Sequence, residues 1–450
     1  MKTATSRGIK DGLPARTRDP LRIAPDWSLT ILMAPRSNFS RQVIAITGGS
    51  VIGQLVLLAV TPLLTRLYGP VEFGLFGLFS VFVNTTSVAL ALRFDMAIPA
   101  ARSTLLAERL LALNFAVLLP TSLLATLIFF GLQQIGPRGF RALPTWSAAL
   151  VLVSLTLTGL FTTLRLWQAR ALNFRNIGSA LASQGVARAL LPMIFGVLNP
   201  MWFGLALGDV TGRVFGILRL LPGTRGALLR LLREHPLHLL ITARRFRRYP
   251  MLLLPSSLID AIASFLPLPL IASLFGIGAA GEFALITRIA AAPSALLGAS
   301  VADVFHAHFP GWLHESEQVA RTEFLRTLIK LASISAALYI PSAILAPFAV
   351  PKLLGQDWAH AGHAFRILTP YLAVALVVNP LSRVLAVTGR MGYKLIVDFF
   401  FLLVPTAGLW ASRALGFGPA LAVFSALSTA IFMLYLYWMW RSIGHPVQST

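Results

Sequence analysis

Residues 43–65 read VIAITGGSVIGQLVLLAVTPLLT, an uncharged and mostly apolar run of the length that a helix needs to cross a bilayer. Eleven similar stretches follow. They cover residues 73–92, 110–133, 146–164, 177–197, 201–218, 251–274, 282–304, 327–350, 364–388, 395–412 and 417–440. None shows the polar–apolar alternation of a transmembrane β-barrel. The sequence therefore predicts an all-α polytopic membrane protein with twelve transmembrane helices.

The composition of the 450-residue chain favours the same class. Apolar residues make up 56% and charged residues 12%, and the mean hydropathy is +0.75. A soluble domain is about one quarter charged. The sequence has no cysteine, which excludes disulfides, thiolate catalysis and cysteine-bound iron–sulfur or zinc sites.

The distribution of Lys and Arg predicts the orientation. With the N-terminus in the cytoplasm, 27 of these residues fall in cytoplasmic segments, five fall outside and six lie within the predicted helices. Cytoplasmic loops of membrane proteins carry such an excess, so we expect both termini inside. The net charge of +22 then marks one side of a membrane and does not indicate a nucleic-acid partner.

A weak internal repeat divides the chain into two halves. Pro62-Leu-Leu-Thr-Arg-Leu-Tyr-Gly69 aligns with Pro269-Leu-Ile-Ala-Ser-Leu-Phe-Gly276, and each copy precedes a Glu-Phe-x-Leu sequence. Equal orientation of the copies predicts a parallel repeat, an arrangement found in transporters that bind substrate between their halves. We expect a disordered basic tail (1–42), an N-terminal six-helix lobe (43–221), a basic linker (222–250), a C-terminal six-helix lobe (251–440) and a cytoplasmic tail (441–450).

Motifs of soluble catalysis are missing from the sequence. It contains no P-loop and no G-x-S-x-G nucleophile elbow. Histidine pairs at 306/308 and 360/363 have no carboxylate or cysteine to complete a metal site. Every external loop is short, which leaves no room outside for a catalytic domain. We therefore expect no enzymatic activity, no metal and no cofactor.

Ionisable side chains within the predicted helices indicate a functional interior. Such groups are costly in lipid and usually face a bundle interior or a watery cavity. Arg188 is about eleven residues, about 16 Å, into its helix and so near the midplane. Asp209 and Arg213 are four residues apart and can pair along one helix, which would leave Asp209 with a purely structural role. Glycines at 204, 208, 212 and 216 of the same helix would let a neighbour approach closely.

An arginine-rich cavity suits an anionic ligand, because the guanidinium group binds phosphate in bidentate geometry and stays charged. Arg188, Arg213, Arg288 and Arg366 are the intramembrane candidates for contacts to substrate. Asp209, Asp260 and Asp398 are candidates for coupling to H⁺ or Na⁺.

Two segments of the chain resemble a known family. The first contains Thr65-Arg-Leu-Tyr-Gly-Pro-Val-Glu-Phe-Gly-Leu-Phe76 and Leu92-Arg-Phe-Asp-Met-Ala-Ile-Pro99. The second contains Arg247-Arg-Tyr-Pro250, Leu254-Pro-Ser-Ser-Leu258 and Gly281-Glu-Phe-Ala-Leu-Ile-Thr-Arg288. Both look like the starts of the two halves of bacterial lipopolysaccharide and exopolysaccharide repeat-unit flippases. These form the polysaccharide-transport branch of the multidrug/oligosaccharidyl-lipid/polysaccharide exporter superfamily.

The resemblance implies a multi-pass protein of the bacterial inner membrane with two six-helix lobes around a central cavity. It implies movement of an undecaprenyl-diphosphate-linked oligosaccharide to the periplasmic leaflet by alternating access, for O-antigen or exopolysaccharide synthesis. Membrane lipid, H⁺ or Na⁺ and a polysaccharide polymerase are the implied partners. Arg66, Arg93, Asp95 and Arg288 carry over as candidate functional positions.

Three other functions remain open from sequence. One is a peptidoglycan-precursor flippase of the same fold, a role that would make the gene essential. A multidrug exporter of the same superfamily would need an acidic or aromatic pocket for cationic drugs, and the excess of arginine argues against one. A membrane-embedded glycan polymerase would need a positioned acid or base near an external face. The short external loops make that function the weaker alternative.

Overall fold

The computed structural model describes residues 36–224, 226–227, 235–293, 299–382, 384–388 and 390–444. These residues contain helices, turns and bends and no strand. The N-terminal helices are α2 (Arg36–Leu67), α3 (Pro70–Ser87), the 3₁₀ turn η1 (Phe94–Ala97), α4 (Thr104–Ile135), α5 (Arg138–Arg141), α6 (Ser147–Arg170), α7 (Phe174–Leu198), α8 (Trp202–Leu220) and the 3₁₀ turn η2 (Leu221–Gly223).

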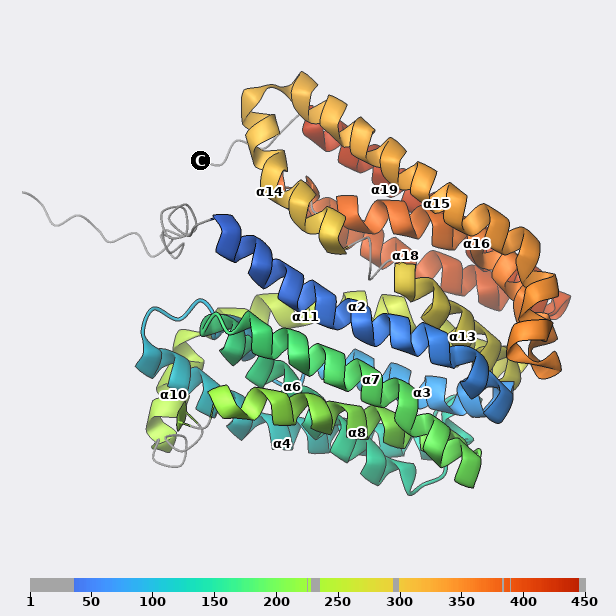
Figure 1. The fold of residues 1–450 in the computed structure, drawn as a ribbon, viewed down its shortest axis with the longest axis horizontal. Coiled ribbons are helices and arrows are strands. Elements are labelled where there is room, and N and C mark those ends of the chain that lie inside the picture. The colour runs from blue at the N-terminus through green and yellow to red at the C-terminus, as the bar shows by residue number, and fades with distance from the viewer. Residues whose placement is uncertain are drawn as a thin grey trace, which may run out of the picture. The chain divides into compact units, whose positions relative to one another are not determined.

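The helix α10 (Pro236–Arg245) lies in the predicted linker and is followed by a π-helical turn, η3 (Tyr249–Leu253). The remaining elements are α11 (Leu254–Phe265), α12 (Pro267–Phe275), α13 (Ile277–Pro293), α14 (Ala299–Glu315), α15 (Glu317–Leu354), η5 (Gln356–Trp358), α16 (Ala359–Leu381), α17 (Val384–Val387), α18 (Met391–Ala411), η6 (Arg413–Leu415) and α19 (Phe417–Ile443). Figure 1 shows the helices in this order.

Nine helical stretches among the described residues are long and apolar enough to cross a membrane. Each coincides with one of the twelve predicted stretches. The other three predictions fall on α3, α8 and the α13–α14 region, where residues 294–298 lie outside the described part of the chain. The chain is thus an all-α, multi-pass membrane protein.

Several boundaries differ from the predictions for identifiable reasons. α3 starts at Pro70, a favoured first helical residue, and ends five residues before the predicted boundary. The chain then turns through Leu92 and Arg93, both with positive φ. Within the predicted helix 251–274, α11 passes directly into α12 at Leu266, whose backbone stays helical, and Pro267 removes one hydrogen bond of the ladder there.

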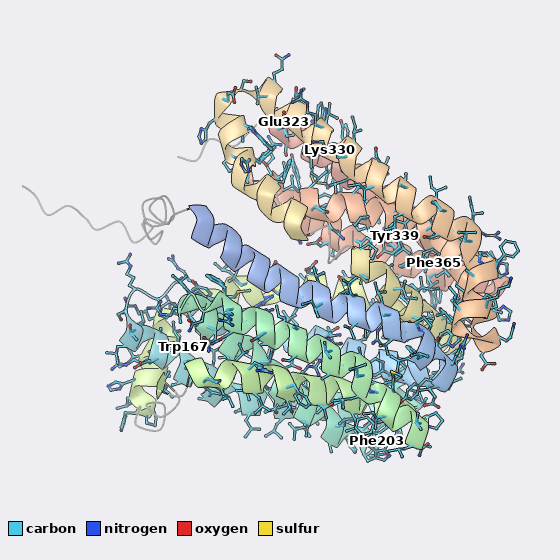
Figure 2. All side chains as sticks on the ribbon, in the orientation of Figure 1. Trp167, Phe203, Glu323, Lys330, Tyr339 and Phe365 are labelled. Carbon is cyan, nitrogen blue, oxygen red and sulfur yellow. The ribbon has the colours of Figure 1, made fainter. Side chains whose placement is uncertain are left out.

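The predicted tail and linker also contain helix. α2 already begins at Arg36, inside the predicted tail, and residues 1–35 and 445–450 lie outside the described residues. In the linker, α10 packs against α4, and Phe246 and Tyr249 join a cluster with Trp167 at the end of α6. Trp167 and Phe203 lie at opposite ends of the N-terminal helices (Figure 2). Phe203 belongs to an aromatic group with Trp146 and Trp202, the residue type that marks a membrane–water boundary.

The two halves meet mainly along α3 and α13, the helices that follow the repeated sequences. In each copy of the repeat, one helix ends just before the final glycine and the next helix begins directly after it. The second of these glycines, Gly276, has a φ of 93°, which favours glycine. A Cβ on Gly74 would stand 2.1 Å from the Ile277 carbonyl oxygen, and one on Gly281 would stand 1.7 Å from that of Pro70. Glycine therefore lets α3 pack on the backbone of α13 and lets α13 pack on the backbone of α3. One hydrophobic core continues through it from α2 to α19.

Candidate functional site: the central cavity between the lobes

A cavity of about 390 Å³ lies between the two sets of helices. We call it the central cavity. Its walls come from α2, α3 and α7 on one side and from α11, α12, α13, α16, α18 and α19 on the other. Ser264, Phe265 and Pro267 line it where α11 passes into α12.

Two arginines from different lobes line the central cavity. Arg188 comes from α7, and Arg288 comes from α13. Their positive charges interact with each other and with Asp209. The sequence predicted both as cavity-lining residues, and the structure places both there.

Asp209 connects Arg188 to Arg213. The Arg188 Nε lies 2.6 Å from Asp209 Oδ1, and the Arg213 Nη1 lies 2.6 Å from Asp209 Oδ2. We call these three residues the arginine cluster. The side chains of Asp209 and Arg213 are 5% and 7% exposed, whereas that of Arg188 is 41% exposed. The i,i+4 pair on α8 was predicted from sequence. The pair between helices was not, because spacing along one helix carries no information about its neighbour.

The glycine row of α8 allows this arrangement. A Cβ on Gly208 would meet the Pro192 ring at 2.3 Å, and one on Gly212 would meet Arg188 Cγ at 2.4 Å. The predicted close approach of a neighbouring helix is confirmed, and that neighbour is α7. Gly212 leaves the space through which Arg188 reaches Asp209.

The C-terminal lobe supplies most of the aromatic lining of the central cavity. Tyr371 lies between Phe401 and Phe424, with ring centroids 6.2 and 5.8 Å away. The other aromatic side chains from this lobe that line the cavity are Phe265, Phe283, Phe401 and Phe424.

The N-terminal lobe adds the polar side chains of Gln54, Ser80 and Asn84 beside Phe73 and Phe76. Sequence reasoning missed these residues, because aromatic residues on an apolar helix do not reveal which face they occupy.

Asp260 and Asp398 belong to a second charged group, in the C-terminal lobe. The Lys394 Nζ lies 2.5 Å from Asp398 Oδ2 and 3.8 Å from Asp260 Oδ1. We call these residues the lysine cluster. The Asp260 side chain is 61% exposed, and that of Asp398 is 15% exposed. The cluster connects α11 to α18.

Arg66 and Arg93 connect the lobes at opposite ends of α3. The Arg66 Nη2 donates to the Lys352 carbonyl oxygen at 3.3 Å, next to a bond from Trp358 Nε1 to the Thr65 carbonyl oxygen at 2.9 Å. The Arg93 Nε donates to Ser257 Oγ at 3.0 Å. Neither arginine is among the residues that line the central cavity.

Arg93 has a left-handed backbone with φ of 63° and precedes the buried Asp95. Burial raises the pKa of the Asp95 carboxyl group above its usual value, and the nearby charge of Arg93 partly offsets this rise. A strained backbone and a buried acid together mark this turn as a constrained part of the fold.

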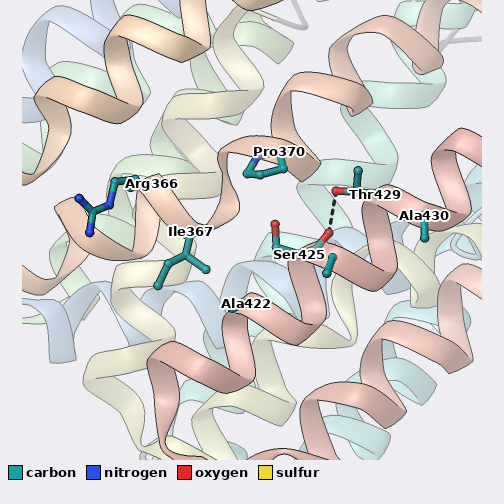
Figure 3. Close-up of a pocket in the computed structure, with 8 residues that line it drawn as sticks. Arg366, Ile367, Pro370, Ala422, Ser425, Thr429 and Ala430 are labelled. Atoms are coloured by element: carbon teal, nitrogen blue, oxygen red, sulfur yellow. Dashed lines mark hydrogen bonds between the residues drawn. The ribbon is translucent and has the colours of Figure 1, made fainter.

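Arg366 occupies a different place. It lies in a separate groove of about 660 Å³ between α16 and α19 (Figure 3). Its position within a predicted helix was read from the sequence, whereas the direction of its side chain depends on how α16 packs. Among the described residues, no group of three His, Asp or Glu side chains is arranged to hold a metal ion.

The fold is that of transporters of the MOP superfamily. An inward-facing multidrug resistance MATE family transporter of that superfamily aligns with a TM-score of 0.57 and 15% identity, over 90% of this chain and 97% of the other. An outward-facing MATE transporter gives a TM-score of 0.55 and 14% identity, over 90% and 95%. A MOP superfamily transporter from Pyrococcus furiosus, described as having a binding pocket of reverse polarity, gives 0.54 and 14% identity, over 91% and 96%. At 14–15% identity, these alignments show a shared fold.

The chain belongs to the family described as polysaccharide biosynthesis protein, which it matches over residues 63–362. That range contains α3 to α15 entirely and hence both cavity arginines. A search of curated protein sequences found no match. Family and fold together confirm the predicted resemblance to the polysaccharide-transport branch of the superfamily.

Proposed function

We propose that this protein moves an undecaprenyl-diphosphate-linked oligosaccharide repeat unit from the cytoplasmic to the periplasmic leaflet of the bacterial inner membrane. The product would serve O-antigen or exopolysaccharide synthesis and pass to a polymerase outside. The observation that carries the proposal is the convergence of Arg188 and Arg288, from opposite lobes, on one cavity.

The charge of this site fits a diphosphate. Arg188, Arg213 and Arg288 against Asp209 leave two uncompensated positive charges. Asp209 pairs with the Nε of Arg188, so the two terminal nitrogens of that guanidinium group, Nη1 and Nη2, can bind a ligand. Arg213 is buried behind Asp209 and holds that carboxylate in place. Arg188 and Arg288 are thus the proposed ligand contacts, and Asp209 and Arg213 position Arg188.

A diphosphate bound by both arginines would draw the lobes together. Without an anion, the two guanidinium groups repel each other across the cavity. With one, each can form charge-assisted hydrogen bonds to it. In alternating access, the contacts between the lobes would break at one end of the cavity while those at the other end stay closed. The bonds of Arg66 and Arg93 are the proposed contacts at the external and cytoplasmic ends.

The sugars would lie against the aromatic wall of the C-terminal lobe. Tyr371, Phe401 and Phe424 present apolar ring surface and one hydroxyl group to the cavity. Gln54 and Asn84 offer amide groups on the opposite wall. The lipid tail would remain in the bilayer.

The lysine cluster is the proposed coupling site. Lys394 already neutralises one of its two carboxylates, so uptake of H⁺ or Na⁺ would release the lysine from Asp398 or Asp260. Asp209 is less suited to coupling, because two arginines hold it and its side chain is 5% exposed.

The cellular test uses a deletion strain complemented with wild-type or variant genes. Undecaprenyl-diphosphate oligosaccharide should accumulate in the deletion strain, shielded from an external lectin, and the wild-type gene should release it. Arg288→Ala should fail to do so at normal protein level, and Arg288→Lys should recover only part, because lysine lacks the bidentate fork. Full export by Arg288→Ala would contradict the proposal.

Export of drugs is the second candidate function, and the multidrug transporters of the same fold favour considering it. Cationic drugs would meet two cavity arginines here. Drug sensitivity of the deletion strain with an unchanged pool of lipid-linked glycan would support this function in place of the first.

A further inference from the structure

The groove that contains Arg366 lies apart from the central cavity. It lies between α16 and α19 and is lined by Arg366, Ile367, Pro370, Ala422, Ser425, Ala426, Thr429 and Ala430. We call it the outer groove. Ala422, Ala426 and Ala430 are all exposed, as are Arg366 and Pro370 on the facing helix. Tyr371 and Phe424, which line the central cavity, lie on other faces of these two helices, so the outer groove opens away from that cavity and toward the lipid.

The length and direction of the outer groove match one leaflet. On the predicted topology both helices run inward from the external side. Ala422 lies five residues and Ala430 thirteen residues below Phe417, which corresponds to depths of about 8 and 20 Å along α19. Half of the hydrocarbon core is about 15 Å thick. The groove therefore extends from the external half of the bilayer to about 5 Å past the midplane, which is enough for the length of an outer-leaflet acyl chain.

The single charge in the outer groove lies at the end near Ala422 and away from Ala430 (Figure 3), which is the external end on the predicted topology. The neighbour of Arg366, Ile367, lies 3.9 Å from where a Cβ on Gly418 would stand, in the first turn of α19, so Arg366 is level with the external end of that helix. None of the described residues forms an ion pair or hydrogen bond with its side chain, by contrast with Arg188 and Arg213. A lipid-facing arginine is costly unless it reaches an anion or the interface. A phosphate at the outer boundary supplies that anion.

We propose that the outer groove binds one phospholipid of the outer leaflet. Its phosphate pairs with the Arg366 guanidinium group, and one acyl chain lies over Ala422, Ala426 and Ala430. The hydroxyl of Thr429 donates to the Ser425 carbonyl oxygen at 2.7 Å, so it presents no free donor to the chain. This lipid would hold α16 against α19 while the central cavity opens and closes, and the proposal does not depend on the transported substrate.

The test is a titration of the delipidated, full-length protein with dioleoylphosphatidylglycerol, followed by native mass spectrometry. Arg366→Gln removes the charge, and Ala426→Leu fills the groove while keeping the charge. Each should weaken binding of one lipid by at least about tenfold, because the first removes a charge-assisted hydrogen bond and the second fills the space for the acyl chain. Arg413→Gln, another exposed external arginine, and Ala149→Leu, an exposed alanine on α6, should bind like the wild type.

Two further ligands distinguish the sources of the binding. Dioleoylglycerol has the same chains without phosphate and should bind far more weakly than dioleoylphosphatidylglycerol. Equal binding would overturn the role of Arg366. Tighter binding of undecaprenyl phosphate at the groove would overturn the phospholipid assignment in favour of the glycan carrier.

A labelling experiment keeps the proposal testable if both variants fold poorly. In the wild-type protein, phosphatidylglycerol with a photoreactive acyl chain should label α19 between Ala422 and Ala430. Labelling confined to other helices, or unchanged lipid binding by Arg366→Gln and Ala426→Leu, would overturn it.

Discussion

The arginine cluster and the lysine cluster have opposite composition. In the N-terminal lobe one carboxylate is held by two guanidinium groups, and in the C-terminal lobe one ammonium group is held by two carboxylates. Each cluster connects two helices. The carboxylate of the first is nearly inaccessible, while that of Asp260 in the second is 61% exposed. A buried, net positive cluster suits a fixed anion site, and an open, net negative cluster suits exchange with small cations.

Removing one carboxylate from each cluster should give the largest contrast. Asp209→Ala leaves Arg213 buried without a counter-charge, and breaking such a buried pair costs about 3–5 kcal/mol. Asp398→Ala leaves Lys394 with Asp260 and access to water, so the loss should be about 1 kcal/mol or less. Thermal unfolding in detergent measures both. Equal losses of stability would show that the clusters do not differ in burial as described.

Filling the space beside Arg188 should have the next largest effect. Gly212→Ala places a Cβ 2.4 Å from Arg188 Cγ, and overpacking of this kind costs about 1–3 kcal/mol. Export should fall because Arg188 is displaced from Asp209. The matched control is Gly131→Ala in α4, where an added Cβ meets nothing within 4 Å. Normal export by Gly212→Ala would contradict the positioning role of Asp209.

The sequence predicted the membrane class and arginines in the interior, because these depend on apolar length and on the free-energy cost of charge in lipid, while the division into two six-helix lobes stays a prediction. It also predicted the Asp209–Arg213 pair, which depends on spacing within one helix. It could not pair Arg188 with Asp209 or place Lys394 near Asp260, since both contacts join separate helices. Arg366 shows the same limit: the sequence placed it within a helix, but its direction away from the central cavity depends on packing between helices.

The contact between the lobes near the cytoplasmic end should contribute less. Ser257→Ala removes the acceptor of Arg93, and a hydrogen bond of this kind contributes roughly 0.5–1.5 kcal/mol. Because this bond joins the lobes, the variant should open more readily to the cytoplasm. Cysteine labelling from the cytoplasmic side, on a chain that contains no native cysteine, measures that opening. Unchanged labelling would separate Arg93 from the movement of the lobes.

The smallest change in stability is expected in the lysine cluster. Lys394→Gln alters a partly exposed group, which typically contributes up to about 1 kcal/mol. Its effect should appear in coupling: transport in proteoliposomes should change its dependence on a proton or sodium gradient. Arg188→Ala, by contrast, should weaken substrate binding and leave that dependence as it is. The reverse result would exchange the roles of the two clusters.

The most direct measurement is binding of farnesyl diphosphate, a short polyprenyl diphosphate, to the purified protein. The account predicts that wild-type protein binds it more tightly than farnesyl monophosphate. It also predicts that Arg188→Ala and Arg288→Ala each weaken binding by about tenfold or more, as for a lost hydrogen bond between charged groups. Equal binding of diphosphate by the wild type and both variants would contradict the central claim that these two arginines form the site.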